Sequence, residues 1–123
     1  MDQTPNIWDG FCQLLGKVFY CSAMADKVIK AEEISKLNDL IEEHWQADGK
    51  PILASFYSCV NLGFDTEQLW IEIAAEKVVD PGLFSHEMIE KIMKTSYKVA
   101  ASYASTNKSE IIFISQLRIA LQK

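Results

Sequence analysis

The feature that most constrains the fold is the stretch from Val18 to Ile41, V-F-Y-C-S-A-M-A-D-K-V-I-K-A-E-E-I-S-K-L-N-D-L-I. Apolar residues recur every three or four positions on both sides of a short polar break. This spacing is typical of amphipathic helices and does not fit the alternation of a strand. We expect one helix to end near Ala25, an acidic elbow to follow, and a second helix to begin near Ala31. A similar break occurs near residues 105–109.

The same spacing and its terminators predict about six helices along the chain. Gly63 is a typical C-cap, Asp65 opens a pattern that resembles a capping box, Ser85 is a good N-cap, and Asn107 precedes Glu110 at capping-box spacing. The expected helices cover approximately residues 5–25, 30–45, 51–62, 66–78, 86–104 and 108–121, with a polar loop at 46–50. The last of them is apolar around most of its circumference, which predicts that it is the most buried.

Length and composition predict one domain, residues 1–123, with an all-α, compact fold. A chain of 123 residues with 49% apolar residues can bury a core without disulfides or metals. No apolar run approaches the roughly 20 residues that a membrane-spanning helix needs. The first residues lack the basic segment of a secretion signal.

The negative charge is concentrated in one segment. Residues 26–48 contain seven acids and three lysines, within a chain whose net charge is -5. There is no cationic patch for phosphates, so nucleic acid is not an expected partner. Glu32, Asp39 and Glu43 fall on one face of the second helix, opposite its apolar stripe. A solvated helix face is the simplest interpretation, and a surface for a protein partner is the functional one.

The sequence predicts no enzyme. The histidines, His44 and His86, have no cysteine or histidine at zinc-ligand spacing, and the chain has no nucleophile elbow or phosphate loop. The three cysteines, Cys12, Cys21 and Cys59, are odd in number and lack paired spacing. This favours reduced thiols in a cytoplasmic protein, with Cys12 and Cys21 serving as small core residues.

The first elbow carries a family resemblance. Ala23-Met24-Ala25-Asp26, followed by Ile29 and Glu32-Glu33, resembles the signature of the tellurite-resistance TerB-like family, and residues 107–113 resemble the end of its small bacterial members. The resemblance implies a bundle of two pseudo-repeated helical hairpins, in a group linked to stress and tellurite resistance. Some members carry elbow acids that have been linked to divalent metal. Here Lys27 stands where the family usually has glycine.

Asp26 and Glu33 are the candidate metal ligands. Both offer hard carboxylate oxygens near the first elbow, where a divalent cation is conceivable. Lys27 and Lys30 place positive charge beside them, so we expect no stoichiometric ion and no other cofactor. Instead, Asp26 would accept hydrogen bonds in the turn, and Glu33 would lie near the N-terminus of the second helix.

The expected function is therefore a noncatalytic protein-interaction or scaffold module with an unidentified protein partner. The alternative is a small divalent-ion-binding or sensing protein that uses Asp26 and Glu33. The sequence is also compatible with a homo-oligomer. Three apolar residues near expected loops, Phe64, Leu83 and Phe84, either cover helix ends or form an exposed patch.

Overall fold

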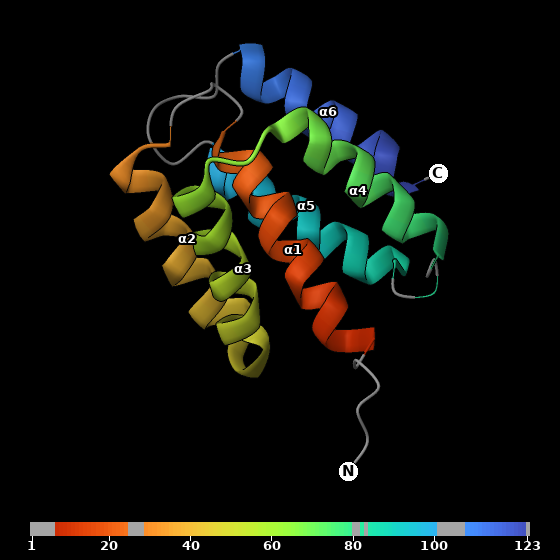
Figure 1. The fold of residues 1–123 in the computed structure, drawn as a ribbon, viewed down its shortest axis with the longest axis horizontal. Coiled ribbons are helices and arrows are strands. Elements are labelled where there is room, and N and C mark those ends of the chain that lie inside the picture. Colours follow the sequence, from red (N-terminus) through yellow and green to blue (C-terminus); the bar gives the residue numbers. More distant parts are fainter. Residues whose placement is uncertain (1–6, 25–28, 80–81, 83, 101–107, 123) are drawn as a thin grey trace.

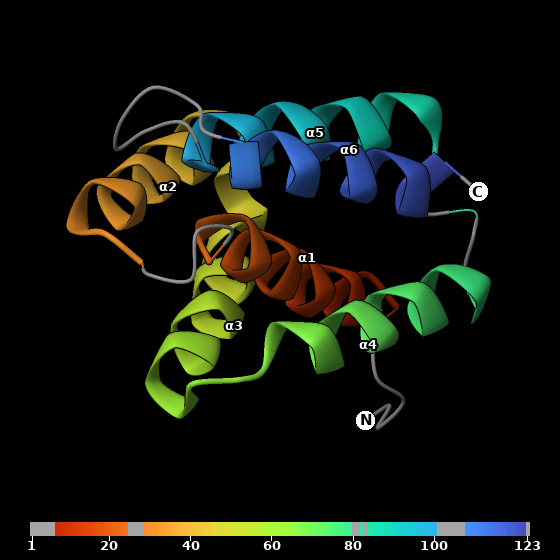
Figure 2. The same cartoon turned by 90° about the horizontal axis from the view of Figure 1, so that it is seen from above.

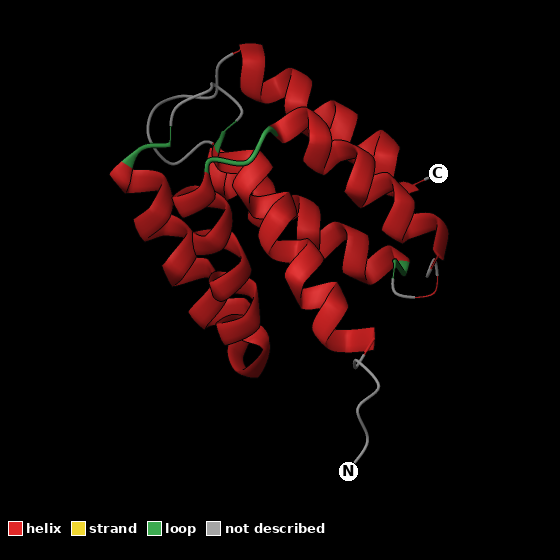
Figure 3. Cartoon of the chain, in the orientation of Figure 1, coloured by secondary structure: helices red, strands yellow, loops and turns green. Residues whose placement is uncertain are grey.

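The described residues of the computed structural model, 7–24, 29–79, 82, 84–100 and 108–122, form six α-helices with no strand among them (Figure 3). This confirms the predicted all-α bundle. In chain order the elements are α1 (Ile7–Ala23), α2 (Ala31–His44), the 3₁₀ turn η1 (Gln46–Asp48), α3 (Gly49–Leu62), α4 (Thr66–Val79), α5 (His86–Ala100) and α6 (Lys108–Gln122). Both predicted elbows include positions outside the described residues, among them Asp26, Lys27 and Asn107.

Helix α1 is the centre of the fold. It contacts every other α-helix. Figure 1 shows α1 between α3 and α4, and Figure 2 shows α5 and α6 on one side of it and α3 and α4 on the other. Its buried apolar residues cover most sides of the helix and make up a large part of the core: Phe11, Cys12, Leu14, Leu15, Val18, Phe19, Tyr20, Cys21 and Ala23. A helix that is apolar on most sides is stable only when neighbours cover it, and α1 satisfies that condition.

Three predicted helix boundaries are confirmed, one by its backbone conformation and two by side-chain hydrogen bonds. Gly63 ends α3 in the left-handed conformation, with φ of 64°, which glycine adopts without steric cost. Asp65 Oδ1 accepts a bond from the Glu67 amide at 3.0 Å, so Asp65 caps α4. Ser85 Oγ accepts one from the Met88 amide at 3.2 Å and caps α5.

The predicted polar loop at residues 46–50 is wrong. The chain turns through η1 and enters α3 directly at Gly49. Gln46 takes a positive φ of 42° to make this turn. A Cβ on Gly49 would lie 2.8 Å from Ile41 Cγ2, so glycine permits the tight junction between α2 and α3. The sequence interpretation treated Asp48-Gly49 only as a loop signal and missed this packing role.

The prediction that the last helix is the most buried is also wrong. Helix α6 contacts α5, α4 and α1, and Leu117 and Leu121 are fully buried there. Its outer face exposes Ile112 by 47% and Ile119 by 60%. The cause is position: α6 lies at the edge of the bundle, so its neighbours cover one side only (Figure 2). No helix among the described residues is both long and apolar enough to cross a membrane.

Two interactions between α2 and α5 involve Trp45, which follows α2. Its indole N–H donates to Thr95 Oγ1 at 3.2 Å, and the Lys91 ammonium lies 4.1 Å from the ring centroid. The second contact is a cation–π interaction, an attraction that is stronger when the aromatic ring is shielded from water. Trp45 is buried, as its place on the apolar stripe predicts. These contacts hold α2 against the core by its inner face and leave its outer face in solvent.

Candidate functional site

The acidic outer face of α2 is exposed, as the helical spacing predicts. Glu32, Asp39 and Glu43 all point to solvent on this face, and Glu42 is exposed beside them. Lys36 is an exposed cation on the same face. We call Glu32, Lys36, Asp39, Glu42 and Glu43 the α2 acidic face. Four carboxylates and one ammonium give it a net negative charge.

A shallow hollow lies on the N-terminal half of this face. Its volume is about 400 Å³, and its lining consists of Ala31, Glu32, Ser35, Lys36 and Asp39. The lining therefore combines two carboxylates, from Glu32 and Asp39, with the Lys36 ammonium and the Ser35 hydroxyl. Such a lining can receive an ammonium or guanidinium group from a partner.

The structure places only one of the two candidate metal ligands. Asp26 lies outside the described residues. Glu33 is buried, and its Oε1 accepts a hydrogen bond from the Lys30 backbone N–H at 2.8 Å. The Glu33 amide in turn donates to the Lys30 carbonyl at 3.0 Å. Glu33 therefore closes the first turn of α2 in the manner of a capping box, at the N-terminus of the helix where the sequence places it. Within the described part of the chain, no three acidic, histidine or cysteine side chains form a metal-binding group.

The sequence interpretation missed a second hollow, which lies between α1 and α3. Its volume is about 420 Å³, and its lining consists of Gln13, Lys17, Pro51, Ala54, Ser55, Ser58, Cys59 and Phe64. We call it the α1–α3 groove. Helix α1 contributes the polar side chains Gln13 and Lys17, and α3 contributes mostly small residues. Phe64, at the corner between α3 and α4, is 41% exposed.

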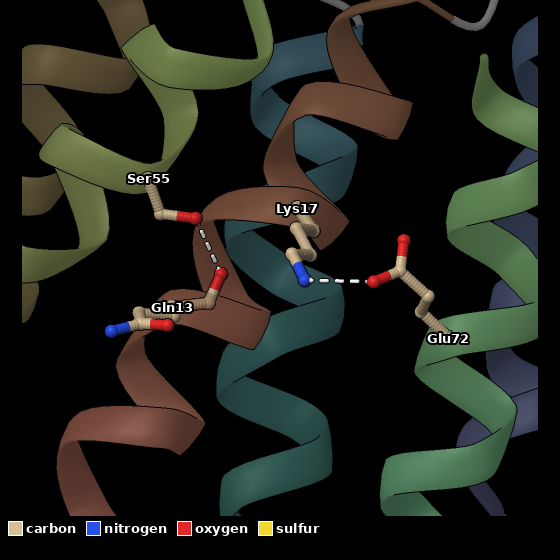
Figure 4. Close-up of polar contacts among 4 residues, drawn as sticks. All are labelled: Gln13, Lys17, Ser55 and Glu72. Atoms are coloured by element: carbon tan, nitrogen blue, oxygen red, sulfur yellow. Dashed lines mark hydrogen bonds and ion pairs between the residues drawn. The ribbon is translucent and has the colours of Figure 1, made fainter. Parts of the chain in front are cut away.

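Polar contacts hold the walls of the α1–α3 groove in place (Figure 4). Ser55 Oγ donates to the Gln13 carbonyl at 2.6 Å and joins α3 to α1. Lys17 Nζ bonds Glu72 Oε1 at 3.1 Å and joins α1 to α4. The Tyr20 hydroxyl donates to the Phe64 carbonyl at 2.9 Å and fixes the corner. The groove is therefore preformed by contacts among three helices.

The cysteine in the groove is not set up as a nucleophile. Burial raises the pKa of the Cys59 thiol; nearby Lys17 lowers this pKa and Glu72 raises it. Burial, with a smaller effect of Cys59, raises the pKa of Cys21 to about 12. A reactive thiol needs the opposite shift, toward the thiolate. Cys12, Cys21 and Cys59 are all buried thiols outside any disulfide, and the groove lining holds no histidine or carboxylate to serve as a base.

Two apolar residues near loops take different roles. Phe84 is buried and packs edge-on against Phe11, with ring centroids 5.3 Å apart, so it covers the core beside α1. Phe64 stays partly exposed at the rim of the groove. Leu83 lies outside the described residues.

Comparisons with known proteins found no matching family model, no matching curated protein and no matching solved structure. The geometry of these two surfaces therefore carries the functional argument.

Proposed function

We propose that this chain is a noncatalytic interaction module that binds a basic segment of a partner protein through the α2 acidic face. The observation that carries the proposal is the exposure of Glu32, Asp39, Glu42 and Glu43 on one helix face, with Lys36 as the only lysine between them. The inner face of α2 packs against the core through the buried residues Leu37, Leu40 and Ile41. The outer face is therefore free for a partner.

Charge is the reason for choosing a basic partner. Carboxylates in one surface patch raise the rate of encounter with a cationic segment and select against acidic ones. Because these carboxylates are exposed, salt screens their attraction for a cationic partner, and at physiological salt the attraction is weak beyond about 8 Å. The α2 acidic face should accordingly bind cationic partners in preference to anionic ones, and added salt should weaken the binding.

One further feature favours an interaction role over ion binding. Glu33, one of the two candidate metal ligands, already accepts the Lys30 N–H. The first-elbow resemblance and the all-helical fold agree with a place among the TerB-like domains of bacterial stress and tellurite-resistance systems, in the cytoplasm. In that setting the module would act as a scaffold and perform no catalysis.

The proposal is tested by affinity capture from a native lysate at two salt concentrations. The informative variant is Glu32→Gln/Asp39→Asn, which neutralises both carboxylates of the hollow. The matched control is Glu67→Gln/Glu87→Gln, which removes the same charge from exposed positions on α4 and α5. We expect a basic protein to be retained by the wild type and the control and lost by the α2 variant and at high salt. Equal retention by both variants would refute the proposal.

A further inference from the structure

We infer that the α1–α3 groove is a second binding site, one that takes a carboxylate attached to a small apolar body. This goes beyond the proposed function because it uses another face of the molecule and a ligand of opposite charge. The inference rests on the charge of the lining, on the donors of Lys17 and on the shape of the walls.

The lining of the groove is cationic. Lys17 is its one charged residue, and the remaining polar members, Gln13, Ser55 and Ser58, are neutral. The raised pKa of Cys59 keeps its thiol uncharged at neutral pH, so it adds no negative charge. An anion entering the groove therefore meets one ammonium group, which is also paired with Glu72 just outside the lining.

Lys17 already forms an ion pair with a carboxylate of the protein itself. Its Nζ lies 3.1 Å from Glu72 Oε1, and the two side chains are 29% and 42% exposed. An ammonium group has three N–H donors. The Glu72 bond uses one of them, so two donors remain to contact a ligand oxygen. Partial burial of the lysine strengthens such a charge-assisted bond relative to one in open water.

The walls suit a small apolar body beside that carboxylate. Pro51 and Ala54 on α3 and the ring of Phe64 provide apolar surface, while Ser58 and the Gln13 amide offer neutral hydrogen bonds. A volume of about 420 Å³ falls in the usual range for small-molecule sites. The Ser55 hydroxyl hydrogen is already donated to the Gln13 carbonyl, so Ser55 shapes the wall without donating to a ligand.

Glu72 competes with the ligand for Lys17. The Glu72 carboxylate attracts the same ammonium and repels an incoming anion. Replacing Glu72 by glutamine removes this repulsion and weakens the competing bond to Lys17, because a neutral amide oxygen accepts less strongly than a carboxylate. If the groove is a carboxylate site, loss of this ion pair should tighten ligand binding. If the ion pair is purely structural, its loss should not increase the affinity.

The test is a ¹⁵N NMR titration of the intact chain with phenylacetate and, separately, with its neutral analogue phenylacetamide. Shifts are followed at the Gln13 side-chain amide and the backbone amides of Ser55 and Ser58. A second arm uses the peptide acetyl-Ala-Ala-Phe with a free or an amidated C-terminus. Tighter binding of phenylacetate identifies a free acid as the ligand, and tighter binding of the free peptide identifies a peptide terminus. Equal shifts with acids and amides in both arms would overturn the inference.

Three variants complete the test. We expect Lys17→Met, which keeps an unbranched apolar stem but lacks the ammonium, to weaken carboxylate binding about tenfold, the size of one lost charge-assisted bond. Glu72→Gln should tighten binding several-fold. Lys94→Met, at an exposed position on α5, should leave it unchanged. Should Lys17→Met fail to fold, Glu72→Gln still decides, because unchanged or weaker binding in that variant contradicts the carboxylate site.

Discussion

Ser55 on α3 lies directly against the backbone of Gly16 on α1. A Cβ placed on Gly16 would come within 2.5 Å of the Ser55 Cβ and 2.6 Å of the Ile52 carbonyl oxygen. One turn away, Ser55 Oγ bonds the Gln13 carbonyl. The absence of a side chain at Gly16 therefore lets the two helices approach closely at Ser55, which also lines the α1–α3 groove.

Gly16→Ala should destabilise the fold. The added methyl would overlap a backbone carbonyl, so the helices must move apart, at a typical cost of about 1–3 kcal/mol. Alanine in a helix interior recovers about 0.5–1 kcal/mol relative to glycine. We expect a net loss, seen as a lower urea midpoint with an unchanged denaturant slope.

The matched control is Gly10→Ala in the same helix. A Cβ at Gly10 would meet no atom within 4 Å, so only the helix preference operates. Stability should stay equal or rise by about 0.5–1 kcal/mol. If both alanine variants behave alike, the close approach of α1 and α3 is wrong.

The position of this close approach could not be predicted from the sequence. The sequence by itself favours another place for a neighbouring helix, the small residues near the end of the first helix, which include Ser22 and Ala23. The structure buries both, with Ser22 Oγ donating to the Val18 carbonyl at 3.0 Å, and it adds a close approach at Gly16 that the sequence does not indicate. Helical periodicity is a local property, so the helices were predictable. Which turn of one helix meets which turn of another depends on the whole bundle.

Leu117→Ala should cost about 2–5 kcal/mol, because Leu117 is fully buried and its truncation leaves a cavity. Ile119→Ala, two residues later on the exposed side of α6, should change the free energy of unfolding by no more than about 0.5 kcal/mol. Chemical denaturation of both variants measures the difference. Similar losses at the two positions would mean that α6 is covered on its outer face, for example by a second copy of the chain.

Glu33→Ala should destabilise the protein by about 1.5–3 kcal/mol, the usual range for a hydrogen bond to a charged group. The variant leaves the Lys30 N–H without its acceptor and removes a buried side chain. Glu32→Gln, at the adjacent exposed position, is the control and should be nearly neutral. Thermal unfolding with and without added Ca²⁺ separates this role from ion binding. A calcium-dependent rise in Tm that Glu33→Ala abolishes would favour the metal alternative.

Stability should fall as the pH rises above about 9. The pKa of Cys21 is raised to about 12 from an ordinary value of 9.0, so between these values the unfolded chain loses a proton that the folded chain keeps. The folded state then becomes less favourable, by up to about 1.4 kcal/mol for each pH unit. The raised pKa values of Tyr20 and Cys59 act in the same direction. Urea midpoints between pH 8 and 11 should decline less steeply in Cys21→Ala; an identical decline would show that Cys21 does not contribute.

The two candidate surfaces differed in how far they could be predicted. The α2 acidic face follows from the sequence because Glu32, Asp39 and Glu43 repeat at helical spacing within one element. The α1–α3 groove does not, because Lys17 and Phe64 are far apart in sequence and meet only through the crossing of α1 and α3. The sequence signal at Lys17 was a single cation inside an apolar helix, which by itself does not identify a partner. Glu72, its partner, lies 55 positions away.

The most direct test of the interaction role is zero-length carbodiimide crosslinking in a native lysate, followed by mass spectrometry of the linked peptides. The reagent joins a carboxylate to a lysine amine only where the two are in contact. We expect links from Glu32, Asp39 or Glu43 to lysines of one basic partner, lost when salt is raised before the reagent is added. Links confined to other exposed acids, such as Glu67 and Glu87, would contradict the assignment of the α2 acidic face as the binding surface.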